Sequence, residues 1–293
     1  MKQLNNKVFA IFCAILSALL YGICIPFSKM LSSHVSSLIL GGLLYLGAGF
    51  GLLITNFVKK NDLSLTLDKK DVLNIICMVV LDAFAVSFLM WGLSLTTSAN
   101  ASLISNFELV ITSLAAYLFF REKVSFRLFL GIILITIACI ILNFEGNESL
   151  NFGYGAPMVI LASICWGFEN NFTKLLSTKD TRQITIIKGC FSGSIAMILG
   201  FMAQENLPEF SWIILSMFLG FFSYGLSVSL YIFSQRHLGA SKTGAYFALA
   251  PYMGVISSLF ILKERPELQF YIALLIMISA TFLVISDTLK SKN

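Results

Sequence analysis

Apolar segments long enough to cross a bilayer recur along the whole chain, with short polar connections between them. A helix of about 20 apolar residues spans a hydrocarbon core of about 30 Å. Helices satisfy their own backbone hydrogen bonds in lipid, and the alternating pattern of a membrane β-barrel is not seen. The pattern therefore predicts an all-α membrane protein with ten transmembrane helices. We place them at residues 8–31, 36–58, 72–95, 98–120, 125–143, 153–176, 183–203, 211–234, 240–262 and 268–288.

The composition favours a membrane protein over a soluble one. Charged residues make up only 12% of the chain and hydrophobic residues 57%, whereas a typical soluble domain is about one-quarter charged. The connections leave no room for a separate soluble domain. The first apolar segment follows Lys2 and Lys7, as in a signal peptide, but it is too long and lacks a clear cleavage site. We therefore expect it to be the first transmembrane helix.

The basic residues are distributed very unevenly between the two sides of this topology. With the N-terminus in the cytoplasm, only Lys29, Lys263 and Arg265 of the 20 basic residues fall on the outer side. The positive-inside rule then predicts a multi-pass protein of the cell membrane with both termini in the cytoplasm. This bias explains the net charge of +5, so no nucleic-acid partner is expected.

Two short motifs occur twice, in the same order. "YGICIPFSK" at residues 21–29 shares its aromatic–Gly start and its Phe–Ser/Thr–Lys end with "WGFENNFTK" at 166–174. "FREK" at 120–123 and "LKER" at 262–265 each close an apolar segment. The chain is thus predicted to contain two five-helix repeats. An odd number of helices per repeat inverts one repeat relative to the other, as in many secondary transporters. We expect the repeats to be residues 1–148 and 149–293.

The sequence around the second motif pair also resembles a known family. "LTTSANASLISNFELVITSLAAYLFFREKVS" (95–125) and "LGASKTGAYFALAPYMGVISSLFILKERP" (238–266) are similar to the EamA-like branch of the drug/metabolite transporter superfamily. The resemblance covers almost the whole chain. It implies ten helices, a central cavity lined largely by helices 1, 3, 4, 6, 8 and 9, and export of small metabolites or drugs, although some members take up solutes. The proline that often follows the glutamate of helix 4 is Leu109 here, whereas Pro251 has the matching place in helix 9.

Three acidic residues lie within predicted helices: Asp82 in helix 3, Glu108 in helix 4 and Glu169 in helix 6. An ionisable side chain at the centre of a transmembrane helix costs about 2.5–3.5 kcal/mol on insertion scales, so it is a functional hypothesis by default. The alternative is a protonated, hydrogen-bonded acid that only holds helices together. A desolvated carboxyl group is suited to exchanging a proton. Glu108 and Asp82 are therefore candidates for proton coupling, with Glu169 as an alternative carrier of the proton.

The "ENN" triplet of helix 6 belongs to a polar face. Trp166, Glu169, Asn170 and Thr173 recur at i, i+3, i+4 and i+7, which is one side of a helix. We expect this face to line the cavity. Acids beside Trp and Tyr suit an organic cation through charge pairing and cation–π attraction. The predicted solute-binding residues are Tyr21, Trp166, Glu169, Asn170 and Tyr246.

Several other residues within the spans allow a structural interpretation. Pro26 removes a backbone donor and is expected to kink helix 1. Lys29 lies near a helix end, where reaching to the headgroups is the default. The same default applies to Lys188, which could instead pair with Glu169. The six cysteines lie within spans without C-x-x-C spacing and are expected to be small apolar residues rather than disulfide partners or metal ligands.

Together these features predict a secondary transporter, proton-coupled or facilitative. It would move a small metabolite, amino acid or cationic amphiphile across the bilayer by alternating access, with export favoured and import of a quaternary amine as the alternative. An intramembrane enzyme is not expected, because H-E-x-x-H and G-x-S-x-G are absent. A channel would more often show a repeated polar filter. No cofactor or metal is expected.

Overall fold

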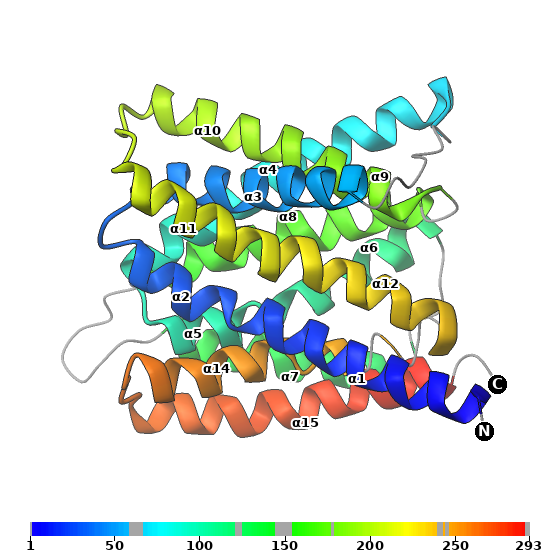
Figure 1. Cartoon of the computed structure of the whole chain (residues 1–293). Helices are drawn as coiled ribbons and strands as arrows, with labels where there is room; N and C mark the ends of the chain where they lie inside the picture. The colour runs from blue at the N-terminus through cyan, green and yellow to red at the C-terminus, as the bar shows by residue number, and fades with distance from the viewer. Residues whose placement is uncertain are drawn as a thin grey trace.

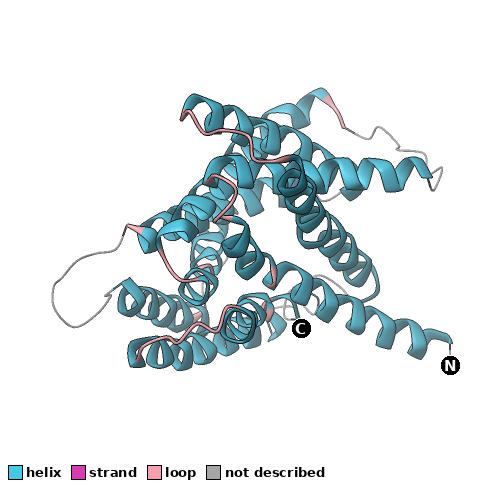
Figure 2. Ribbon diagram, turned by 60° about the vertical axis from the view of Figure 1, so that its left-hand side comes forward, coloured by secondary structure: helices cyan, strands magenta, loops and turns pink. Residues whose placement is uncertain are grey.

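The computed structural model describes residues 2–58, 67–120, 125–143, 154–176, 179–238, 243 and 246–290. All regular structure in these residues is helical (Figure 2). The helices form one bundle in which α1 begins and α15 ends at the same end (Figure 1). Among the described residues, six helical segments are long and apolar enough to cross a membrane, and two shorter apolar helices accompany them. The all-α membrane fold is therefore as predicted.

The first repeat makes five crossings of the bundle. The first crossing is divided into two helices and so is the fourth, whereas a short 3₁₀ turn opens the third. Its elements are α1 (Lys2–Gly22), α2 (Cys24–Leu31), α3 (Ser37–Val58), η1 (Lys69–Asp71), α4 (Val72–Leu95), α5 (Ser98–Ile104), α6 (Phe107–Phe120) and α7 (Phe126–Asn143).

The second repeat also makes five crossings. Two of them contain a π-helical turn, η2 and η3, which continues directly from the α-helix before it. The elements are α8 (Gly155–Leu175), α9 (Thr181–Ile187), η2 (Lys188–Ser192), α10 (Gly193–Met202), α11 (Phe210–Gly220), η3 (Phe221–Leu226), α12 (Ser227–Leu238), α14 (Ala250–Ile261) and α15 (Leu268–Lys290).

The predicted helix ends agree with these elements to within four residues, except at the start of the first crossing, where α1 begins six residues earlier, and in the ninth crossing. There α14 begins only at Ala250, and residues 239–242, 244 and 245 lie outside the described part of the chain. The predicted boundary between the repeats, 148/149, also lies outside it. The first crossing is interrupted at Ile23, one turn before Pro26, where the proline predicted a kink.

The packing pairs the helices of one repeat with those of the other. The third crossing, α4, packs on the sixth, α8, and the equivalent eighth crossing, α12, packs on the first, α1. α7 packs on α15, α3 on α10, and α5 on α14, and in each of these pairs the two partners hold equivalent places in the two repeats. Such exchanged contacts are those of two inverted repeats related by a pseudo-two-fold axis.

The bundle has an apolar exterior and polar groups inside. Large apolar side chains such as Phe12, Leu118, Phe218 and Phe282 are exposed on the outer surface. Conversely, buried hydroxyl, amide and carboxylate groups occur along the helices in the interior. A soluble protein of this size would not expose so many large apolar residues. This distribution is that of a protein solvated by lipid. The intramembrane acids lie in the polar interior.

Candidate functional site

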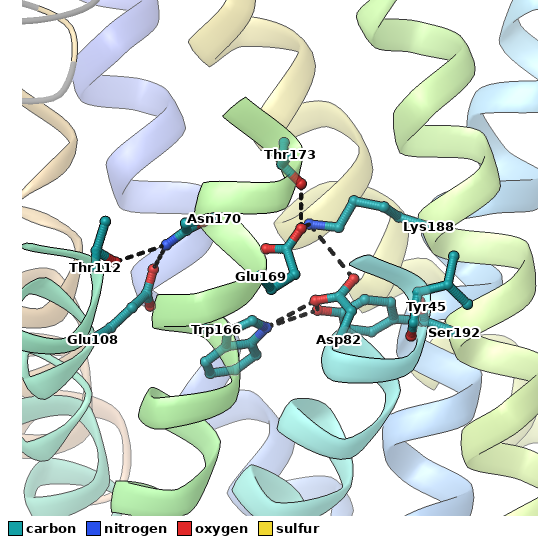
Figure 3. Close-up of polar contacts among 11 residues, drawn as sticks. Tyr45, Asp82, Glu108, Thr112, Trp166, Glu169, Asn170, Thr173, Lys188 and Ser192 are labelled. Carbon is teal, nitrogen blue, oxygen red and sulfur yellow. Dashed lines mark hydrogen bonds and ion pairs between the residues drawn. The ribbon is translucent and has the colours of Figure 1, made fainter. Parts of the chain in front are cut away.

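A lysine and two acids from three different crossings meet inside the bundle. Lys188 Nζ lies 3.1 Å from Glu169 Oε1 and 3.5 Å from Asp82 Oδ2 (Figure 3). The two carboxylate side chains are 1% and 0% exposed, whereas that of Lys188 is 23% exposed. Asp82 belongs to the first repeat, and the other two residues belong to the second. We call these three residues the charge cluster.

The first carboxylate oxygen of Asp82 is held by two aromatic donors. Tyr45 Oη donates to Asp82 Oδ1 at 2.8 Å, and Trp166 Nε1 donates to the same oxygen at 2.9 Å. The second oxygen, Oδ2, makes no hydrogen bond among the described residues and has only the Lys188 ammonium beside it. A buried carboxylate oxygen without a hydrogen bond is costly, and the nearby ammonium offsets part of this cost.

The position of Lys188 follows from close packing between two backbones. A Cβ on Gly189 would lie 2.5 Å from the amide nitrogen of Gly49 in α3, so only glycine fits there. On the other side of η2, the Ser192 hydroxyl donates to the carbonyl of Val79 in α4 at 3.0 Å. The π-helical turn is thus fixed between α3 and α4, and its first residue faces the acids. π-helical turns occur frequently at functional sites.

Glu108 forms a second polar group beside α8. Asn170 Nδ2 donates to Glu108 Oε1 at 2.6 Å and lies 3.4 Å from Thr112 Oγ1 (Figure 3). The neighbouring Asn171 donates to the carbonyl of Gly167 in its own helix at 2.9 Å. None of the ion pairs within the described residues involves Glu108, which is therefore an acid supported only by neutral groups.

A row of aromatic rings leads away from the charge cluster. The ring of Tyr45 lies 4.9 Å from that of Tyr224 in η3, and Tyr224 lies 5.6 Å from Tyr21 in α1, measured between ring centroids. Tyr21 continues the row to Phe247 at 5.2 Å, and Phe247 contacts Tyr231 at 5.0 Å. The row alternates between the repeats, so ring contacts connect the two halves in the interior.

The predicted site residues fall into three groups. Trp166 and Glu169 join the charge cluster, where the Thr173 hydroxyl also donates to Glu169. Asn170 joins Glu108 instead, so the polar face of α8 is divided between two neighbours. Tyr21 lies in the aromatic row. Tyr246 is described, but no described contact of its side chain connects it to any of these groups.

Two participants were not among the predicted site residues. Tyr45 carries no sequence signal, because one tyrosine in a long apolar helix is ordinary. Lys188 was expected to reach the headgroups by default, with pairing to Glu169 as the alternative. The default is wrong and the alternative is confirmed, because Lys188 pairs with Glu169 and also with Asp82. An unpaired excess of acids within the spans was the one signal that could have pointed to it, since buried charges are normally compensated.

The end of the bundle away from both termini is tied together by carboxylates that cap helices. Glu264 accepts hydrogen bonds from the amides of Ser98 and Ala99 at the start of α5, both at 2.8 Å. Glu205 accepts in the same way from the amides at the start of α3, at 3.3 and 2.9 Å. Both acids come from the second repeat and both helices from the first. Anions favour helix N-termini because of the free N–H groups and the macrodipole.

Lys29 makes the complementary contact at the same end. Its Nζ donates to the carbonyls of Leu93 and Thr96, at 2.6 and 2.8 Å, where α4 ends. A cation at a helix C-terminus satisfies free carbonyls and the negative end of the macrodipole. This side chain therefore connects two crossings of the first repeat rather than only extending towards the headgroups, as the sequence suggested.

An inverted-repeat bundle with buried charges between its halves is an architecture found in many secondary transporters. The family profile described as the EamA-like transporter family matches residues 8–144 and again 153–286. The chain belongs to this family. The two matches follow one another along the sequence, as expected for an internal repeat.

Similar proteins agree with this assignment. An uncharacterised transporter of Methanothermobacter thermautotrophicus is 28% identical over 298 aligned positions, covering 95% of this chain and 87% of the relative. The uncharacterised transporter YyaM of Bacillus subtilis is 22% identical over 71% of this chain and 70% of its own length. One solved crystal structure superposes with a TM-score of 0.68 at 13% identity and covers 94% of both chains, which supports the fold alone.

Proposed function

We propose that this transporter exports a small cationic or amphiphilic metabolite from the cell by alternating access. The observation that carries the proposal is the charge balance of the interior. Three acids, Asp82, Glu108 and Glu169, lie around α8. Within the described residues, Lys188 is the one cation in an ion pair with any of them, and it pairs with Asp82 and Glu169. Buried charges require compensation, so such an interior favours additional positive charge, either protons or a cationic solute.

Solute recognition in this proposal uses Glu169 and the aromatic row. An ammonium group would pair with the carboxylate of Glu169, and the faces of Trp166 and Tyr21 would supply cation–π attraction. Asn170 adds a neutral hydrogen-bonding group on the next position of α8. Tyr246 belongs to the same proposal because it precedes Phe247, whose ring contacts Tyr21.

Proton coupling is assigned to Glu108, with Glu169 as the alternative and Asp82 as a further candidate. Glu108 is hydrogen-bonded to the amide of Asn170, a partner that can remain when the acid is protonated. Asn170 follows Glu169 directly in α8, so the proposed proton and solute groups are neighbours. A change of charge at one is therefore felt at the other.

The proposed orientation follows from the basic residues. Both termini would be cytoplasmic, and the capped end of the bundle would face outside. Of the 20 basic residues, this topology places only Lys29, Lys263 and Arg265 at that end. The repeats would divide the chain at 148/149, within the segment between the two family matches. Export from the cytoplasm would then start at the end that holds both termini.

Solute exchange in liposomes tests the proposal. Purified protein should mediate saturable counterflow of at least one member of a panel of amino acids and organic ammonium compounds. Glu169→Gln should weaken solute binding by about 30-fold or more, because losing a desolvated charge partner costs about 2–5 kcal/mol. Glu108→Gln should preserve exchange but abolish accumulation driven by a proton gradient. Unchanged binding and unchanged proton-driven transport in both variants would exclude this mechanism.

A further inference from the structure

Lys188 differs from its two acids in exposure and in freedom of movement. Its carboxylate partners are fully buried, and each is fixed by other groups: Asp82 by Tyr45 and Trp166, and Glu169 by Thr173. The lysine is 23% exposed, and both of its ion-pair partners are these acids. A lysine side chain is a compact ammonium on a flexible four-carbon stem. It is therefore the one member of the charge cluster that is both partly exposed and held only by the other two.

The charge cluster is also incompletely neutralised. Two carboxylates and one ammonium leave one negative charge when all three groups are ionised. A purely structural ion pair inside a membrane would be expected to match one acid with one base, because an excess buried charge is costly. Here one lysine is shared between two acids, and its distance to Asp82 Oδ2 is long for a hydrogen-bonded pair.

The chemistry of the ammonium is that of the proposed solute. Lys188 presents a primary ammonium on an alkyl stem to two acids beside aromatic rings, and an alkylammonium would present the same group. The two acids have essentially no exposed surface, whereas the lysine that pairs with both of them is partly exposed. Aromatic rings such as those of the row that starts at Tyr45 attract organic cations through their faces.

We propose that Lys188 is a resident cation of the Asp82–Glu169 pair, and that an alkylammonium solute binds by displacing it. This inference rests on the proposed function, since it names the substrate class of the same site as an organic monocation. The lysine then has two roles. It compensates the acids when no solute is bound, and it sets the affinity by competing for them.

Removing the competing lysine should raise the affinity for an alkylammonium, whereas a substitution that merely damages the site should lower it. Lys188→Gln should bind n-butylammonium at least about tenfold more tightly than the wild type, because the solute no longer has to displace a bound group. Lys188→Arg, which keeps the charge, should not show this gain. The neutral probe n-butanol should bind the wild type and Lys188→Gln equally. Ligand-dependent thermal shift of the purified protein at pH 7 measures all of these affinities.

A matched control and a rescue variant complete the experiment. Lys179→Gln removes a lysine that also pairs with two aspartates, but outside the site, and should leave the affinity unchanged. If Lys188→Gln does not fold, Asp82→Asn/Lys188→Gln has the wild-type net charge and leaves Glu169 uncovered. It should also bind n-butylammonium more tightly than the wild type.

The outcomes separate the inference from the proposed function. A folded Lys188→Gln or Asp82→Asn/Lys188→Gln protein that binds n-butylammonium no better than the wild type would overturn the competitor role, while a binding wild type would leave the proposed function standing. If no variant and no wild-type sample binds any organic ammonium, both the competitor role and the cationic solute are wrong.

Discussion

The two hydrogen bonds from Glu264 to α5 allow a quantitative prediction about the capped end of the bundle. Glu264→Gln removes the charge and keeps only one acceptor oxygen for the amides of Ser98 and Ala99, each now 2.8 Å from the carboxylate. A hydrogen bond to a charged group contributes about 1.5–3 kcal/mol. Because Glu264 is half-buried, we take the lower end, about 1.5 kcal/mol, which corresponds to roughly a tenfold change in the local opening equilibrium.

Amide hydrogen exchange in detergent micelles measures this opening directly. Exchange of the peptide that begins at Ser98 should be roughly tenfold faster in Glu264→Gln, since exchange reports local unfolding. Glu267→Gln is the matched control, because that side chain is exposed and lies three residues further along the same connection. Equal exchange in the wild type and Glu264→Gln, or equal acceleration by both variants, would refute the assignment of Glu264 as a cap that holds the repeats together.

Three further predictions concern packing, pH and topology. Gly47→Ala and Gly220→Ala should each destabilise the protein by about 3 kcal/mol or more, because the new Cβ would lie 2.0 or 1.9 Å from a backbone carbonyl oxygen of the facing helix. Gly41→Ala is the control: its Cβ would lie 3.3 Å from a side chain, so its effect should be mild. Thermal unfolding measures all three variants. Two aspartates raise the pKa of Lys179 above its usual 10.5. The stability that this ion pair contributes should therefore be present below about pH 10 and lost as the pH rises through the folded pKa. The difference in melting temperature between the wild type and Lys179→Met should shrink at alkaline pH. A cysteine introduced at Asn147 on a cysteine-free background should be labelled by an impermeant reagent from outside the cell; labelling only from the cytoplasm would contradict the proposed orientation.

The positions of the helices follow from the sequence because lipid leaves few alternatives. Every backbone polar group within the bilayer has to be satisfied inside a helix, so the length of an apolar segment predicts the helix closely. The predicted segment 36–58 and the observed α3, Ser37–Val58, differ by one residue. Proline acts through the same local rule, and the break at Ile23 follows from Pro26.

Irregular backbone without proline was not foreseen. The break between α5 and α6 and the π-helical turns η2 and η3 occur in segments whose local sequence reads as continuous helix. At η2, the turn is held by contacts with other helices, including the close approach of Gly189 to Gly49 and the hydrogen bond from Ser192 to Val79. A single-helix pattern contains no information about these neighbours.

The acidic residues themselves were evident from the sequence, because an ionisable group in an apolar span is rare and costly. Their partners were not. Asp82 and Lys188 are more than a hundred positions apart, and the face of α8 that carries both Glu169 and Asn170 could equally have met one neighbour as two. The sequence alone thus determined the class, the crossings, the inverted repeat and the presence of buried charge. Tertiary structure decided which acid has a cation and which has only an amide, because pairing within lipid depends on the rotation and depth of each helix against its neighbours.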